Sequence, residues 1–119
     1  MLKLTPEQEA GAAWLCERGR AILADPAGFG KTAQAIAAAD RAGSQTILVV
    51  APKTLLHNWA WEIGRWSTGK VEIVTTRSPL SPSARWHLTN YEVLTRRDLM
   101  PLWADTLIVD EAHRAKNRK

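Results

Sequence analysis

The stretch AILADPAGFGKTAQ, at residues 21–34, decides the fold of this chain. A short apolar run breaks at a glycine turn, after which Lys31 and Thr32 open an alanine-rich segment typical of a helix. Backbone N–H groups of a tight glycine turn and of a helix N-terminus point at one spot, where an anion is favoured. The pattern therefore predicts a phosphate-binding loop, in which Lys31 reaches the β and γ phosphates and Thr32 holds Mg²⁺.

The stretch departs from the strict phosphate-loop pattern, because Asp25 occupies the position of its first glycine. Gly28 and Gly30 keep the rest of the pattern between a strand-like run and a helix-like run. The alternative interpretation is an ordinary strand–turn–helix junction that happens to contain Gly-Lys-Thr.

Composition bounds the class of protein. The 119 residues suffice for one domain, and no run approaches the 18 apolar residues that a membrane span needs. Cys16 is the only cysteine, which excludes an internal disulfide and suits a reducing, intracellular location. The net charge of +4 comes from the last six residues: without their four basic side chains, 16 − 4 = 12 basic residues face 12 acidic ones. The net charge alone therefore does not indicate a nucleic-acid partner.

The hydrophobic pattern predicts an α/β fold in which strands alternate with helices. Residues 46–51 are apolar on both faces, as in a central parallel strand that helices cover on each side. Over residues 54–66, a helical projection places Leu55, Leu56, Trp59, Ile63 and Trp66 on one buried face. We expect most of the six tryptophans in the core or at an interface between lobes. The predicted strands are 20–24, 46–51, 70–75, 85–89 and 106–110, and the predicted helices are 5–19, 32–42, 54–66 and 92–97, with a loop at 78–83.

Two acids follow the last predicted strand. Strand 106–110 would deliver Asp110 and Glu111 to its carboxyl end, where α/β sheets bind ligands. There Asp110 would orient Mg²⁺ and Glu111 would polarise the water that attacks the γ-phosphorus. The alternative is an ordinary helix N-terminus, with His113 as a capping or core residue.

Five segments, in order, resemble motifs of the first RecA-like lobe of Swi/Snf-type ATPases, within the superfamily 2 helicases. LTPEQ at 4–8 is similar to L-R-P-Y-Q, and ADPAGFGKT at 24–32 is similar to A-D-x-M-G-L-G-K-T, which accounts for Asp25. APKTLLHNW at 51–59 resembles motif Ia, TNYEVL at 89–94 resembles motif Ib, and DEAHRAKN at 110–117 resembles motif II, D-E-A-H-R-x-K-N.

The resemblance implies a P-loop NTPase with a three-layer, RecA-like parallel sheet that binds ATP and Mg²⁺. It implies that Gln8 reads adenine, although this residue could instead complete a capping box with Thr5. It assigns the nucleotide site to Gln8, Gly28, Phe29, Gly30, Lys31, Thr32 and His113, and contacts with the backbone of duplex DNA to Lys53, Thr54, Asn90 and Tyr91.

In the family, a strand carrying motif III lies between the phosphate-loop strand and the Asp-Glu strand, and a second lobe completes the ATP site. This sequence reaches neither, so we expect residues 1–119 to be an incomplete N-terminal lobe with a gap in its sheet, which would leave backbone groups unpaired. The expected function is the ATP-binding lobe of a DNA-dependent ATPase and duplex-DNA translocase, inactive or weak alone; the alternative is a non-catalytic ATP-binding adaptor that docks a partner protein. The location would be cytoplasmic in a prokaryote or phage and nuclear in a eukaryote.

Overall fold

The structure is a computed structural model that describes the backbone of residues 20–24, 31–99 and 104–110, and the side chains of 32–99 and 104–110. The predicted helix at 5–19 lies outside these residues. The elements are β1 (Arg20–Ala24), α2 (Lys31–Arg41), β2 (Ile47–Val50), the 3-10 turn η1 (Lys53–Leu55), α3 (Leu56–Trp66), β3 (Val71–Ile73), β4 (Trp86–Thr89), α4 (Tyr91–Arg96) and β5 (Thr106–Asp110).

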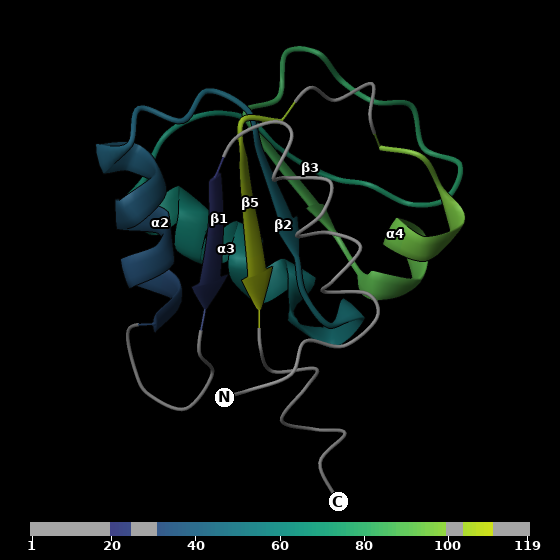
Figure 1. Cartoon of the computed structure of the whole chain (residues 1–119), viewed down its shortest axis with the longest axis horizontal. Helices are drawn as coiled ribbons and strands as arrows, with labels where there is room; N and C mark the ends of the chain where they lie inside the picture. The colour runs from purple at the N-terminus through teal and green to yellow at the C-terminus, as the bar shows by residue number, and fades with distance from the viewer. Residues whose placement is uncertain (1–19, 25–30, 100–103, 111–119) are drawn as a thin grey trace, which may run out of the picture.

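The strands form one parallel five-stranded sheet in the order β1-β5-β2-β4-β3 (Figure 1). Both covered faces of the sheet have apolar side chains, which explains why the strands appear in the sequence as continuous apolar runs. All four residues of β2 and all five of β5 are buried. The predicted α/β class and parallel sheet are therefore confirmed.

The expected gap in the sheet is absent. Strand β1 pairs directly with β5 over its whole length, from Arg20 opposite Thr106 to Ala24 opposite Asp110. Direct pairing gives partners to the backbone groups of β1 and β5 that face each other, and a gap would leave these groups unpaired. The prediction was wrong because the order of parallel strands was taken from the resemblance.

Alternate residues of the central strands build two apolar clusters, one on each face of the sheet. Ile47 and Val49 of β2 contact the cluster beneath α2 and α3, which contains Ile36 and Ile63. The intervening β2 residues, with Val93 of α4, belong to the cluster on the other face. Helices thus cover both faces, as the three-layer prediction requires, and Figure 1 shows α3 behind the strands.

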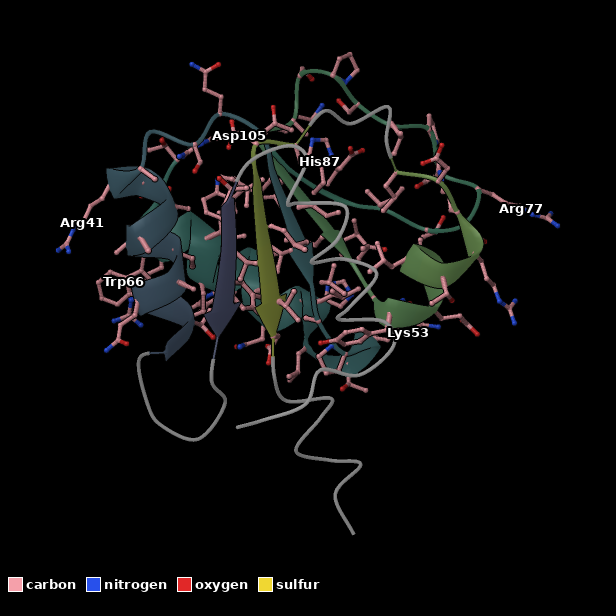
Figure 2. The ribbon with its side chains drawn as sticks, in the orientation of Figure 1. Arg41, Lys53, Trp66, Arg77, His87 and Asp105 are labelled. Carbon is pink, nitrogen blue, oxygen red and sulfur yellow. The ribbon has the colours of Figure 1, made fainter. Side chains whose placement is uncertain are left out.

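The tryptophans that the structure describes divide between core and surface. Trp59 and Trp86 are fully buried, whereas Trp61 and Trp66 are 59% and 53% exposed. The prediction that Trp66 lies on the buried face of its helix was therefore wrong, and Trp66 is the last residue of α3. Its indole N–H instead donates to Glu62 at 2.6 Å on the helix surface, and Figure 2 labels this side chain.

The amino ends of the strands are tied together by the guanidinium of Arg85. Its nitrogens donate to the carbonyl oxygens of Ser44, at 3.0 and 3.1 Å, and Thr68, at 2.9 Å, and to the carboxylate of Asp40 at 2.7 Å. The same guanidinium lies 5.2 Å from the ring centroid of Trp86. One side chain therefore connects the ends of α2 and α3 to the start of β4.

A second link at this edge comes from Asp105, which Figure 2 labels there. Its carboxylate accepts hydrogen bonds from the backbone N–H of Gln45 at 2.9 Å and of Thr46 at 3.2 Å. These bonds hold the segment before β2 against the segment before β5.

Among the described helices, none is long and apolar enough to cross a membrane.

Candidate functional site

Parallel strands place their carboxyl ends at one edge of the sheet, which we call the carboxyl edge. Strand β1 ends at Ala24 and β5 ends at Asp110, and these two residues are register partners. Ala24, after which the predicted phosphate loop begins, therefore lies beside Asp110, the predicted metal-binding acid. The turn η1 and helix α4 follow β2 and β4 at the same edge.

Helix α2 begins at this edge as well. Its first residue is Lys31, and Figure 1 shows that end of α2 at the level of the arrowheads of β1 and β5. Arg41, the last residue of α2, is labelled at the opposite end in Figure 2. The backbone of Lys31 and that of Asp110 thus lie at the same end of the sheet, with half-buried Thr32 in the first turn of α2.

Several predicted site residues lie outside the described part of the chain, and for Lys31 the structure describes only the backbone. Those outside are Gln8, Gly28, Phe29, Gly30, Glu111 and His113.

Hydrogen bonds from other elements hold Asp110 in place. It is 6% exposed, and its carboxylate oxygen Oδ2 accepts from the indole Nε1–H of Trp59, in α3, at 2.8 Å. Its backbone carbonyl accepts from the hydroxyl of Tyr91, at the start of α4, at 2.5 Å. Charge-assisted bonds of the first kind are stronger than those between neutral groups.

Sequence reasoning missed both of these contacts. The principle that a buried indole N–H needs an acceptor could have raised the question for Trp59. However, Trp59 and Asp110 are 51 positions apart, and nothing in the sequence pairs them.

The predicted DNA contacts separate into exposed and buried residues. Lys53 and Thr54 are exposed in η1, and Figure 2 labels Lys53 toward the carboxyl edge. Asn90 is half-buried and caps α4, because its Oδ1 accepts from the backbone N–H of Val93 at 3.0 Å. Tyr91 is only 6% exposed and its hydroxyl points to Asp110, so its side chain belongs to the core rather than to a DNA-binding surface.

The side chains at the carboxyl edge fit a magnesium ion that a phosphate helps to hold. Mg²⁺ takes oxygen ligands and usually binds through one or two carboxylates together with substrate phosphates. Asp110 offers a carboxylate and Thr32 a hydroxyl at this edge. In the part of the chain that the structure describes, no group of three or more His, Cys, Asp or Glu side chains could form a protein cage for a metal.

A parallel sheet with helices on both faces, in which the end of β1 and the start of α2 lie at the same edge as the acid that ends β5, defines a RecA-like α/β lobe. Comparison with known proteins identifies its family: the SNF2-related domain matches residues 7–119. The chain belongs to this family of Swi/Snf-type ATPases, as its motifs predicted.

Two relatives and one solved structure illustrate the similarity. The chain is 32% identical over 98% of its length to the SWI/SNF-related matrix-associated actin-dependent regulator of chromatin subfamily A-like protein 1 of Xenopus tropicalis. It is 30% identical over 98% of its length to the ISWI chromatin-remodeling complex ATPase ISW1 of Saccharomyces cerevisiae. It spans only 13% and 12% of these two proteins, respectively.

The solved structure is the Sulfolobus solfataricus SWI2/SNF2 ATPase core in complex with dsDNA. It aligns with 98% of this chain at a TM-score of 0.60 and 26% identity, and the alignment covers 27% of that chain.

Proposed function

We propose that this chain is the ATP-binding lobe of a DNA-dependent ATPase that moves along duplex DNA, and that a second lobe completes its hydrolytic site. The observation that carries the proposal is the register pairing of Ala24 with Asp110, because it brings the start of the phosphate loop to the acidic strand end. Phosphoryl transfer depends on positioning and charge neutralisation more than on covalent chemistry. The phosphate loop and the acidic strand end together contain the groups that position the phosphates and the groups that neutralise their charge.

Each group at the carboxyl edge has a distinct role in the proposal. The ammonium of Lys31 binds the β and γ phosphates, and Glu111 orients the attacking water and accepts its proton. The hydroxyl of Thr32 and the carboxylate of Asp110 hold Mg²⁺. When bound, the ion neutralises negative charge on the phosphates.

The remaining nucleotide contacts come from residues outside the described part. Backbone N–H groups from Gly28 to Gly30 cradle the phosphates. Gln8 recognises adenine, and Phe29 and His113 complete the pocket. These four assignments rest on the motifs and on family membership.

The proposed DNA surface consists of Lys53, Thr54 and Asn90 at the carboxyl edge. Lys53 and Thr54 are exposed, and a lysine at this position can bind a phosphate of the DNA backbone. Support comes from the Sulfolobus relative, which was solved with dsDNA. A DNA-dependent ATPase acts on the DNA of the cell, so the proposed location is inside the cell.

Nucleotide binding tests the site directly. Lys31→Ala should abolish binding of a fluorescent ATP analogue, whereas Glu111→Gln should retain binding. With a second RecA-like lobe added, Glu111→Gln should also abolish DNA-stimulated phosphate release. Lys70→Ala is the matched control, because Lys70 is an exposed lysine at the amino end of β3. If Lys31→Ala binds the analogue as tightly as the control does, the site assignment is wrong.

Lobe addition separates the proposal from its alternative. Without the second lobe, phosphate release should be very slow, because transition-state arginines are worth about 10³ to 10⁵ in rate in related chemistry. Partner binding that is indifferent to ATP and DNA, without any phosphate release, would favour the non-catalytic adaptor.

A further inference from the structure

The indole of Trp59 is held rigidly at the point where it meets Asp110. Trp59 is 1% exposed and packs in the cluster between α3 and the sheet, with Leu56 and Ile63 of the same helix. A tryptophan enclosed in this way cannot change rotamer without displacing its neighbours. The direction of its N–H is therefore fixed by the apolar core.

That N–H bond serves the carboxylate of Asp110. The donor and acceptor, Trp59 Nε1 and Asp110 Oδ2, are 2.8 Å apart and buried. Leaving a buried indole N–H without an acceptor is unfavourable, so the bond is maintained and also restrains the orientation of the carboxylate. Carboxylates that bind metals are commonly oriented by such neighbouring donors, whose removal weakens metal binding.

Tyr91 secures the backbone of the same residue. Its hydroxyl donates to the carbonyl oxygen of Asp110 at 2.5 Å from the start of α4. Side chains from α3 and α4, which cover opposite faces of the sheet, thus restrain the end of β5 from both sides.

We propose that Trp59 is a positioning residue, which holds the carboxylate of Asp110 in the orientation that binds Mg²⁺, while Tyr91 secures the strand end. Trp59 itself contacts neither nucleotide nor metal. The inference rests on the proposed function, because it takes Asp110 as the magnesium-binding acid.

The test compares two tryptophan variants in the whole chain. Trp59→Phe removes the N–H and keeps an aromatic ring. Trp86→Phe is the matched control, since Trp86 is also fully buried and its Nε1–H donates to the carbonyl oxygen of Thr68 at 3.0 Å, at the amino edge. Binding of a fluorescent ATP analogue is measured in a Mg²⁺ titration and, separately, in EDTA.

For Trp59→Phe, the Mg²⁺ concentration that gives half-maximal binding should rise about tenfold, as for other groups that orient metal ligands. Affinity in EDTA should match that of the parent, because the phosphates are bound by other groups. Trp86→Phe should leave both values unchanged. An unchanged Mg²⁺ requirement in Trp59→Phe, or an equal rise in Trp86→Phe, would overturn the inference.

A measurement on the parent chain covers the case in which Trp59→Phe does not fold. The indole N–H resonance of Trp59 should shift on addition of Mg²⁺ with ADP, but much less with ADP in EDTA, and that of Trp86 should shift in neither. Equal shifts with and without Mg²⁺ would overturn the inference while leaving nucleotide binding intact. If the parent binds no nucleotide in either buffer, the proposed function fails and the inference fails with it.

Discussion

Replacing Arg85 with methionine tests how far one side chain at the amino edge stabilises the lobe. Methionine keeps an unbranched apolar stem of similar length and removes the guanidinium. The carbonyl oxygens of Ser44 and Thr68 would each lose their bonds from Arg85. Asp40 would lose an ion pair in which the Arg85 and Asp40 side chains are 21% and 36% exposed.

The expected loss of stability follows from these contacts. For each of the two carbonyl oxygens, losing the guanidinium costs about 1 kcal/mol net. The ion pair adds at most about 0.5 kcal/mol, because water screens a partly exposed pair. Arg85→Met should therefore lower the free energy of unfolding by about 2–3 kcal/mol. This is equivalent to a fall in Tm of roughly 10 °C for a domain of this size.

Urea unfolding followed by tryptophan fluorescence and by circular dichroism measures this loss. The control is Arg41→Met, because Arg41 is exposed at the end of α2 and no ion pair joins it to an acid among the described residues. The control should change stability by less than about 0.5 kcal/mol. A loss below about 1 kcal/mol for Arg85→Met, or one equal to the control's, would refute the assigned role of Arg85.

Five further substitutions, at four positions, have structural predictions that unfolding or binding can check. Gly69→Ala should lower the free energy of unfolding by about 1–3 kcal/mol, because Gly69 has a φ of +107° and a new Cβ would lie 2.8 Å from the Cβ of Arg85. Gly64→Ala should instead raise it by about 0.5–1 kcal/mol, because Gly64 lies inside α3 and a new Cβ would meet nothing within 4 Å. Ile63→Ala, at a fully buried position, should cost about 2–5 kcal/mol in the same assay. Asn90→Ala should lose about 1 kcal/mol of capping energy, whereas Asn90→Asp should keep the cap and weaken DNA affinity, measured in a salt titration, because it adds negative charge.

The sequence predicted the elements well because most of their signals are local. Strands β1 and β5 have the predicted bounds, 20–24 and 106–110, and β2 is one residue shorter at each end than the predicted 46–51. Helix α2 is closed by Gly43 in the left-handed conformation, with a φ of 72°, as a glycine after the last helical turn predicts. Apolar runs and turn residues determine such features within a few positions.

The order of the strands and the contacts between residues far apart in the sequence could not be predicted from local signals. Which parallel strands pair depends on how the connecting helices pack, and so the direct pairing of β1 with β5 was missed. The surface position of Trp66 was missed because a helical projection assumes that the apolar face stays against the sheet to the last residue. The bond from Trp59 to Asp110 joins residues 51 positions apart, and only the folded sheet brings them together.

At the candidate site, the motifs predicted which segments would lie together, but not which of their side chains would be buried. Asp110 lies beside the end of β1, as a shared site requires. Tyr91 matched a motif that implied DNA contact, but its ring is in the core. A motif match identifies residue types at a spacing, whereas burial depends on the packing of the whole sheet.

The hydrogen bonds of Arg85 and Asp105 hold neighbouring chain segments together at the amino edge, far from the proposed binding groups. An engineer could therefore exchange the exposed side chains of Lys53 and Thr54 for others, in order to change which nucleic acid is bound, without redesigning the framework. The same substitutions made around Ser44 or Thr68 would disturb the framework itself.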